Sequence, residues 1–235
     1  MFRQSAELYD LIYSSFKDYR EEAAQIAALL RVRHPNCRTV LDAGCGTGEH
    51  ARLLAADGFV VDGIDLDPAF VSIASRKNLN GRFVEGDMAD FHLGRRYDAV
   101  LCLFSSIGYV CSLARLGETL RCFREHVTPA GVVVVEPWFQ PGDIDPMRVT
   151  RQTAEGDGLR VTRTARIGVD GRLSTLVFDY EVIDTTGTRT FREEHELGLF
   201  TVDEMQDAFR NAGLDAAYDP IGPGGRGLFV ARTAG

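Results

Sequence analysis

The chain has 235 residues, of which 45% are hydrophobic and 26% are charged, and its formal net charge is −8. This composition is typical of a globular protein with a sizeable core and does not fit a disordered chain. A negative chain repels polyanions, so nucleic acid is not an expected partner. The longest apolar run, around residues 132–135, is far too short to span a bilayer, so no membrane partner is expected either.

The cysteines predict a reducing compartment. There are five of them, an odd number, and no two form a CxxC pair: Cys37, Cys45, Cys102, Cys111 and Cys122. Such cysteines indicate reduced, buried thiols, and no metal site is expected. The first ten residues lack an apolar signal core, which together with the thiols predicts a cytoplasmic protein.

The first two-thirds of the chain alternate between helical and strand patterns. Helical periodicity covers residues 6–33, and a strand at 39–41 leads into a glycine cluster. The following segments are, in order, a helix over 49–56, a strand at 59–64, a helix over 68–76, strands at 82–85 and 99–104, a helix over 113–126 and a strand at 132–135. This rhythm predicts an α/β fold with a doubly wound parallel sheet, which binds ligands at the carboxyl ends of its strands.

After Pro146 the pattern changes to three β-rich segments at residues 160–169, 172–183 and 188–199. Asp170-Gly171 between two alternating runs is a strong hairpin signal. We expect an antiparallel β flap at about 146–199, inserted in a single domain that covers residues 1–235. A last helix over 202–212 precedes a strand pair at 215–218 and 227–231.

The turn after the first strand carries the strongest motif, DAGCGTG at residues 42–48. Dinucleotide-binding proteins use GxGxxG at this place, and here the third glycine comes one residue early. Asp42 stands where it would repel a pyrophosphate and attract the ammonium of an amino acid. The turn therefore favours S-adenosylmethionine (SAM) over NAD, with Asp42, Ala43, Gly44 and Gly46 at the cofactor.

Two more strand ends carry acidic residues. Asp65, which lies 21 positions after Gly44, can accept hydrogen bonds from both ribose hydroxyls, and Leu66 beside it is assigned to the same site. Asp67, before Pro68, is assigned to the cap of the next helix. After the third strand, Asp87 offers a carboxylate to the adenine amino group.

Met88 completes the pattern of these strand ends, because it would pack against the adenine ring. An acidic residue before GxGxG, followed by an acidic end of the second strand, resembles the class I SAM-dependent methyltransferase family over about residues 36–140. The resemblance implies a seven-stranded, mostly parallel sheet whose late strand pair forms a reversed edge. It does not identify the methyl acceptor.

Further segments resemble a narrower group, the N,N-dimethyltransferases of nucleotide-linked aminosugars, as in desosamine and mycaminose biosynthesis. They are YDLIY at 9–13, FSSIGY at 104–109, VVVVEPWF at 132–139 and GGRGLFV at 224–230. This resemblance implies methyl transfer to the amino group of a dTDP-linked amino-deoxysugar. It further implies that Tyr13 and Tyr19 or Arg20 close over the methionine end of SAM, that Phe104 lies near the sulfonium, and that the flap shapes the sugar-nucleotide site and forms a contact in a homodimer.

Residues 138–143 differ from the pattern expected of that group, so an O- or N-methyltransferase of another small metabolite remains the alternative. Two other classes are weaker alternatives. A NAD-dependent oxidoreductase is disfavoured by the early glycine and by Asp42. A catalytically silent SAM-binding module is disfavoured by the residues that accompany the cofactor motif on the acceptor side.

The resemblance also places an active-site histidine at His126, and an imidazole titrates in the range that a general base requires. The alternative is that His126, at the end of a helix, only complements the helix dipole. Both interpretations stay open at this point.

Five residues are candidates for binding the acceptor. Glu136 can bind the amine or a sugar hydroxyl, or it can be a buried carboxylate that accepts hydrogen bonds from loop amides. Trp138 can stack on the substrate or simply pack. Ser106 and Tyr109 offer hydroxyl groups, although Ser106 can also be a helix cap, and Arg226 can face a phosphate or lie in a surface hairpin.

A cluster of arginines follows in the flap region: Arg148, Arg151, Arg160, Arg163 and Arg166. A few arginines can make a pocket attractive to a small anion whatever the net charge of the chain. The alternative, favoured by the alternation of strand side chains, is that they cover the exposed face of the flap.

Overall fold

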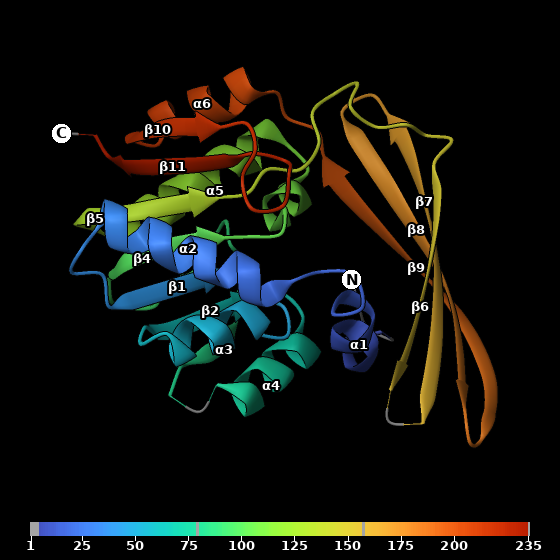
Figure 1. The fold of residues 1–235 in the computed structure, drawn as a ribbon. Coiled ribbons are helices and arrows are strands. Elements are labelled where there is room, and N and C mark those ends of the chain that lie inside the picture. Colours follow the sequence, from blue (N-terminus) through green and yellow to red (C-terminus); the bar gives the residue numbers. More distant parts are fainter. Residues whose placement is uncertain (1–4, 79, 157, 235) are drawn as a thin grey trace.

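The computed structural model describes residues 5–78, 80–156 and 158–234, and it contains two sheets (Figure 1). The larger has seven strands, the number that the resemblance implied, and their order is β10-β11-β5-β4-β1-β2-β3. Its members are β1 (Thr39–Ala43), β2 (Val60–Asp65), β3 (Phe83–Glu85), β4 (Tyr97–Cys102), β5 (Val127–Val135), β10 (Leu214–Asp219) and β11 (Leu228–Thr233). β11 pairs antiparallel with both of its neighbours, so the reversed strand lies one place inside the edge.

Helices cover both faces of this sheet, which makes the fold doubly wound. They are α2 (Tyr19–Arg33), α3 (Glu49–Ala56), α4 (Pro68–Lys77), α5 (Leu113–His126) and α6 (Val202–Asn211). Ile26 and Leu54 belong to the apolar cluster on one face, and Phe123 and Phe209 belong to the cluster on the other. Burial on both faces explains the nearly continuous apolar sequence of β5.

The chain turns from β1 toward β2 and β3 on one side, and later returns to β4 on the other side of β1. The carboxyl ends of β1 and β4 therefore lie at a topological switch point, where α/β sheets bind ligands. Figure 1 shows this edge facing the second sheet.

The predicted single helix over residues 6–33 is wrong. The structure has a short 3-10 helix (Ala6–Leu8), α1 (Tyr9–Tyr13) and then α2, because Asp18 begins a new helix by accepting a hydrogen bond from the backbone N–H of Glu21 at 3.0 Å. The break leaves α1 free to pack against the flap, where Ile12 joins an apolar cluster with Phe178.

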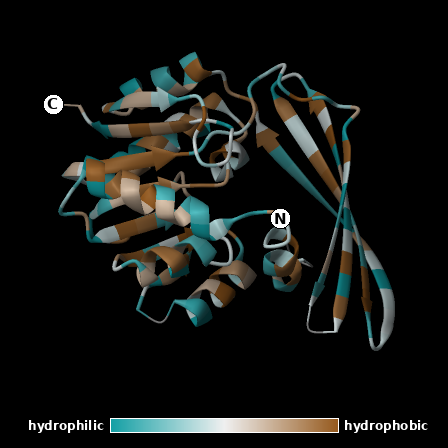
Figure 2. Cartoon of the chain, viewed as in Figure 1, coloured by the Kyte–Doolittle hydropathy of each residue, from teal (hydrophilic) through white to brown (hydrophobic). Residues whose placement is uncertain are grey.

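The flap has four strands in sequential order: β6 (Val149–Gly156), β7 (Leu159–Asp170), β8 (Leu173–Asp184) and β9 (Gly187–Gly198). The predicted hairpin at Asp170-Gly171 is confirmed by the antiparallel pairing of β7 with β8. The prediction missed β6, a polar strand at the sheet edge. Figure 2 shows the flap strands alternating between hydrophilic and hydrophobic residues, whereas β5 is mostly hydrophobic.

The prediction of one domain with an inserted flap stays a prediction. Among the described helices, none has the length and the apolar composition needed to cross a membrane.

Candidate active site

A cavity of about 320 Å³ lies between the carboxyl edge of the large sheet, α1 and the flap. Its size is in the range of small-molecule sites. Eleven of the predicted site residues line it: Tyr13, Gly44, Gly46, Asp65, Leu66, Met88, Phe104, Ser106, Tyr109, Trp138 and Arg226. They come from seven parts of the chain that are far apart in sequence.

The glycine turn forms the floor of the cavity. Gly44, Gly46 and Gly48 all have positive φ angles, of 74°, 53° and 75°. A Cβ atom on Gly44 would lie 2.8 Å from the Cβ of Ser106, whereas a Cβ on Gly46 would meet no atom within 4 Å. The first glycine thus allows close packing of the loop after β4, and the second leaves its side of the turn open to a ligand.

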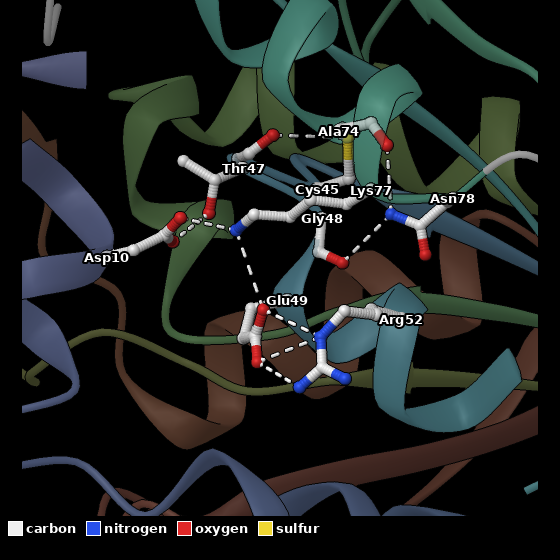
Figure 3. Close-up of polar contacts among 10 residues, drawn as sticks. Asp10, Cys45, Thr47, Gly48, Glu49, Arg52, Ala74, Lys77 and Asn78 are labelled. Atoms are coloured by element: carbon white, nitrogen blue, oxygen red, sulfur yellow. Dashed lines mark hydrogen bonds and ion pairs between the residues drawn. The ribbon is translucent and has the colours of Figure 1, made fainter. Parts of the chain in front are cut away.

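Polar contacts hold the outer side of this turn (Figure 3). Thr47 donates a hydrogen bond to Asp10 at 2.5 Å, and Lys77 forms an ion pair with the same carboxylate. Asn78 Nδ2 donates to the carbonyl oxygens of Gly48 and Ala74, at 3.2 and 2.9 Å. The turn is therefore tied to α1 and α4 before any ligand binds.

Asp65 projects into the cavity from the end of β2. Its Oδ2 accepts a hydrogen bond from the backbone N–H of Gly46 at 2.8 Å, and its Oδ1 accepts one from Asp67 at 2.9 Å. Each carboxylate oxygen keeps a second acceptor position, which a ribose hydroxyl can use. Asp67 itself accepts from Ala69 N at 2.9 Å and caps α4, as predicted.

Asp42 and Ala43 lie behind the cavity wall. Ala43 is part of the core, and the carboxylate of Asp42 is 2% exposed, with burial raising its pKa to about 6. Its Oδ2 accepts no hydrogen bond from the described part of the chain. An unused buried acceptor fits the predicted contact with a cationic ligand.

Asp87, which the sequence predicted at the adenine amino group, is not among the residues that line the cavity. Its carboxylate forms an ion pair with Arg115 and accepts a hydrogen bond from Ala89 N at 2.9 Å. Met88, the next residue, does line the cavity. The apolar half of this predicted contact is therefore in place, and the polar half is not.

Tyr19 and Arg20 line a neighbouring surface pocket that also includes Lys17. The ring of Tyr19 packs edge to face on His50, with centroids 5.0 Å apart. The structure does not bring these two predicted residues to the main cavity. Lys17, which sequence reasoning missed, places its ammonium 3.9 Å from the ring centroid of Phe104.

The loop after β4 forms the acceptor side of the cavity. Phe104 and Ser105 have positive φ angles of 52° and 61°, an unusual conformation for residues other than glycine. The Ser105 hydroxyl donates to the carbonyl oxygen of Pro137 at 2.7 Å and accepts from Arg226 Nε at 2.8 Å. Like Lys17, Ser105 was not predicted, because no local pattern in the sequence marks it as a site residue.

Glu136 links the loop after β4 to Arg226 of the β10–β11 turn. It is 2% exposed and lies outside the cavity wall, accepting hydrogen bonds from Phe104 N at 2.7 Å and from Arg226 at 2.8 Å. The structure thus fits the alternative interpretation of Glu136 as a carboxylate that satisfies loop amides. Trp138 lines the cavity and also packs, since its indole N–H donates to Ser174 at 2.9 Å.

The prediction that His126 is a catalytic base does not fit its position. His126 ends α5 and precedes β5, so it lies at the amino edge of the sheet, opposite the cavity. It is 3% exposed, its Nδ1 donates to the carbonyl oxygen of Cys122 at 2.8 Å, and its Nε2 accepts from Leu93 N at 3.3 Å. Both ring nitrogens are engaged inside the fold, so we correct this assignment to a structural one.

The hydroxyl of Tyr109 contacts a histidine of the flap. It lies 3.2 Å from Nδ1 of His195, a residue of β9 that is 2% exposed. Burial, with a smaller contribution from the positive charge of Arg163, lowers the pKa of His195 to about 4. The imidazole is therefore neutral at physiological pH, and in the tautomer that carries its proton on Nε2 it can accept the proton of the Tyr109 hydroxyl at Nδ1.

A glycine turn open to a ligand, an acidic residue before it and a carboxylate at the end of β2 define the cofactor site of a SAM-dependent methyltransferase. The residues fit SAM, because the buried acceptor of Asp42 suits a positively charged ligand and the carboxylate of Asp65 keeps acceptor positions for the ribose hydroxyls. A family model described as a methyltransferase domain matches residues 40–131. The enzyme is thus a SAM-dependent methyltransferase.

Comparisons over nearly the full length of the chain point to a more specific group of methyltransferases. The chain is 43% identical, over 96% of its length and 89% of the relative's, to the dTDP-3-amino-3,6-dideoxy-alpha-D-glucopyranose N,N-dimethyltransferase of Streptomyces fradiae. The crystal structure of Streptomyces venezuelae DesVI is 37% identical and superposes with a TM-score of 0.93 over 98% of this chain and 99% of that one. SAM-bound CalS10, an amino pentose methyltransferase from Micromonospora echinaspora, is 32% identical with a TM-score of 0.87, over 100% and 98% of the two chains. The chain belongs to the family of dTDP-aminosugar N,N-dimethyltransferases.

Proposed function

We propose that this enzyme transfers methyl groups from SAM to the amino group of a dTDP-linked amino-deoxysugar. The observation that carries the proposal is one continuous cavity, which runs from the cofactor residues Gly46 and Asp65, past Phe104 and Tyr109, to Arg163 in the flap. A cofactor and an acceptor can therefore meet without crossing solvent. The relatives named above, which act on such aminosugars, support the same assignment.

When bound, SAM supplies a methyl group on a positively charged sulfonium. The amine nitrogen forms a bond to the methyl carbon while the sulfur–carbon bond breaks and its electron pair stays on sulfur. The product ammonium then loses a proton to solvent. Because the leaving group is already neutral, the main task of the protein is to hold an unprotonated amine in line with the methyl group.

Tyr109 is suited to that task. We assign the ring proton of His195 to Nε2, so that the Tyr109 hydroxyl donates to Nδ1 and the lone pairs of its oxygen are available to accept an N–H from the amine. Tyr109 is 39% exposed, so its hydroxyl is accessible to an acceptor, and a tyrosine with an ordinary pKa of about 10 is already neutral at physiological pH and orients the amine rather than removing its proton. Orientation of the nitrogen lone pair toward the methyl group is the expected result.

Among the other predicted residues, we propose cofactor contacts for Tyr13, Gly44, Gly46, Asp65, Leu66, Met88 and Phe104, and acceptor contacts for Ser106, Tyr109, Trp138 and Arg226, because all of them line the cavity. Asp42 would act on the cofactor ammonium from behind the turn. His126 is removed from the catalytic set.

Two features of the protein as a whole belong to the proposal. The free cysteines among the described residues suit the reducing cytoplasm. A homodimer would cover exposed apolar residues of the flap and of the loop before it: Met147, Val149, Val169 and Ile183. Sedimentation equilibrium of the purified chain measures this directly, and a mass of one chain at micromolar concentration would contradict the dimer.

The function is tested by incubating the enzyme with SAM and a panel of dTDP-linked amino-deoxysugars. A mass gain of one or two methyl groups on the aminosugar, absent with the matching 3- or 4-hydroxy sugar, is the expected result. If SAM binds but thymidine diphosphate and its sugar conjugates do not bind at millimolar concentration, the acceptor is another small metabolite.

A further inference from the structure

We infer that Arg163, in the middle of the flap strand β7, is the residue that binds the diphosphate of the nucleotide-linked substrate. The inference rests on the proposed function and adds a specific anion site to it. It is carried by the burial of this arginine, by its unused donors and by the absence of a matching negative charge in the described structure.

Arg163 differs from the other arginines of its cluster. Arg148, Arg151, Arg160 and Arg166 are exposed, as the alternation of strand side chains predicts, whereas Arg163 is 4% exposed and lines the cavity. Arg160 and Arg166 form ion pairs with Glu155 and Asp179 at the surface. The sequence-based interpretation of the cluster as a solvated face is therefore right for four members and wrong for one.

The guanidinium of Arg163 is held by aromatic rings rather than by acids. Its Cζ lies 4.7 Å from the ring centroids of both Tyr13 and Phe178, and Nη2 donates to the neutral side-chain amide of Gln152. Nε and Nη1 make no full hydrogen bond in the described part of the chain, and the polar groups near them are the neutral hydroxyls of Tyr13 and Tyr180 rather than acids. Rings fix the plane of the guanidinium and leave donors free, which is the arrangement that a planar fork needs for binding phosphate oxygens.

Burial of a cation without a counter-ion is unfavourable, and a bound anion removes that cost. Burial by itself lowers the pKa of Arg163, but the nearby Tyr13 and Tyr180 raise it on balance, so the group remains charged. Arg226, the other arginine on the cavity wall, already shares its charge with Glu136 at 2.8 Å. Arg163 is thus the better cationic partner for a ligand that carries two phosphates.

The position also suits the proposed acceptor. The ring of Tyr13 contacts residues of both parts of the site, since it lies 5.3 Å from the ring of Phe104 and 4.7 Å from Cζ of Arg163. In an amino-deoxysugar nucleotide, the sugar ring separates the amine from the diphosphate in the same way. An amine near Phe104 and Tyr109 would therefore place its phosphates toward the flap.

The test measures equilibrium binding by calorimetry to the full-length enzyme, with thymidine diphosphate, thymidine and SAM as separate probes. For Arg163→Gln we expect the Kd for thymidine diphosphate to rise by roughly 10- to 100-fold, the effect of losing charge-assisted hydrogen bonds. The Kd values for thymidine and SAM should stay within about twofold of the wild type, which also shows that the variant is folded. Arg163→Lys, which keeps the charge but not the fork, should fall between the two.

Arg160→Gln is the matched control, because it removes an exposed arginine from the same strand and should leave all three affinities unchanged. If Arg163→Gln weakens SAM and spares thymidine diphosphate, the arginine binds the methionine carboxylate of SAM and the inference is overturned. Equal affinities in Arg163→Gln and the wild type overturn it too. Failure of the wild type itself to bind thymidine diphosphate would instead remove the proposed function, and the inference with it.

Discussion

The two sides of the cavity are built in different ways. The cofactor side consists of a seven-residue turn and the ends of neighbouring parallel strands, and its key carboxylate, Asp65, is fixed by backbone N–H groups of Gly46 and Asp67. The acceptor side is assembled from side chains of the loop after β4, the flap and the β10–β11 turn. Backbone geometry therefore holds the cofactor, and long-range side-chain contacts hold the acceptor.

This difference implies separable defects. Changes on the cofactor side should alter SAM affinity, and changes on the acceptor side should alter the rate or the nucleotide affinity with SAM binding intact. The following substitutions test that separation.

The largest effect is expected for Gly44→Ala. The new methyl group would meet Ser106 at 2.8 Å while the backbone keeps a φ of +74°, so the turn has to shift. We expect SAM affinity to fall at least about 100-fold, since a misplaced turn loses several cofactor contacts at once. Gly94→Ala is the control: its φ is +70° but its surroundings are open, so it should lose a little stability and no SAM affinity. Equal SAM affinities in the two variants would disprove the role of close packing at Gly44.

Asp65→Ala should weaken SAM binding by about 1 to 3 kcal/mol, the usual cost of removing a buried hydrogen-bond partner. Calorimetric titration with SAM measures the change. Asp67→Ala is the comparison, because Asp67 caps α4 and should cost about 1 kcal/mol of stability with a much smaller effect on SAM. An unchanged SAM affinity in Asp65→Ala would remove this residue from the ribose contact.

On the acceptor side, Tyr109→Phe should reduce kcat by about tenfold, because the amine loses the acceptor that orients it. SAM affinity should not change. His195→Asn keeps a neutral hydrogen-bonding group near the Tyr109 hydroxyl and should retain more activity than His195→Leu. A loss of SAM affinity in Tyr109→Phe, in place of a loss of kcat, would contradict the division between the two sides.

The smallest effect on catalysis is expected for His126→Ala. A side chain at the opposite edge of the sheet should leave kcat and KM within about twofold of the wild type. Stability should fall by about 1 to 3 kcal/mol, since two hydrogen bonds of a buried ring are lost. Thermal unfolding and steady-state kinetics measure the two quantities, and a rate loss of about 100-fold would restore His126 as the base.

The amino-acid sequence by itself determined the doubly wound sheet, the late strand pair, the Asp170-Gly171 hairpin and the glycine turn after the first strand. These features depend on periodicity and on turns, in which the residues that matter are close together in the chain. The same local reasoning assigned Asp67 correctly to its helix cap.

Only the tertiary structure decided which distant side chains meet. His126 lies at the opposite edge of the sheet from the cavity, and Glu136 and Asp87 are bound to protein partners. Of the five arginines in the flap region, Arg163 alone is buried. A strand pattern says that side chains alternate, but which face is covered depends on what packs against it, and here α1 and the sheet edge cover the face that carries Arg163. The acceptor side could not be predicted because its geometry is made by those long-range contacts.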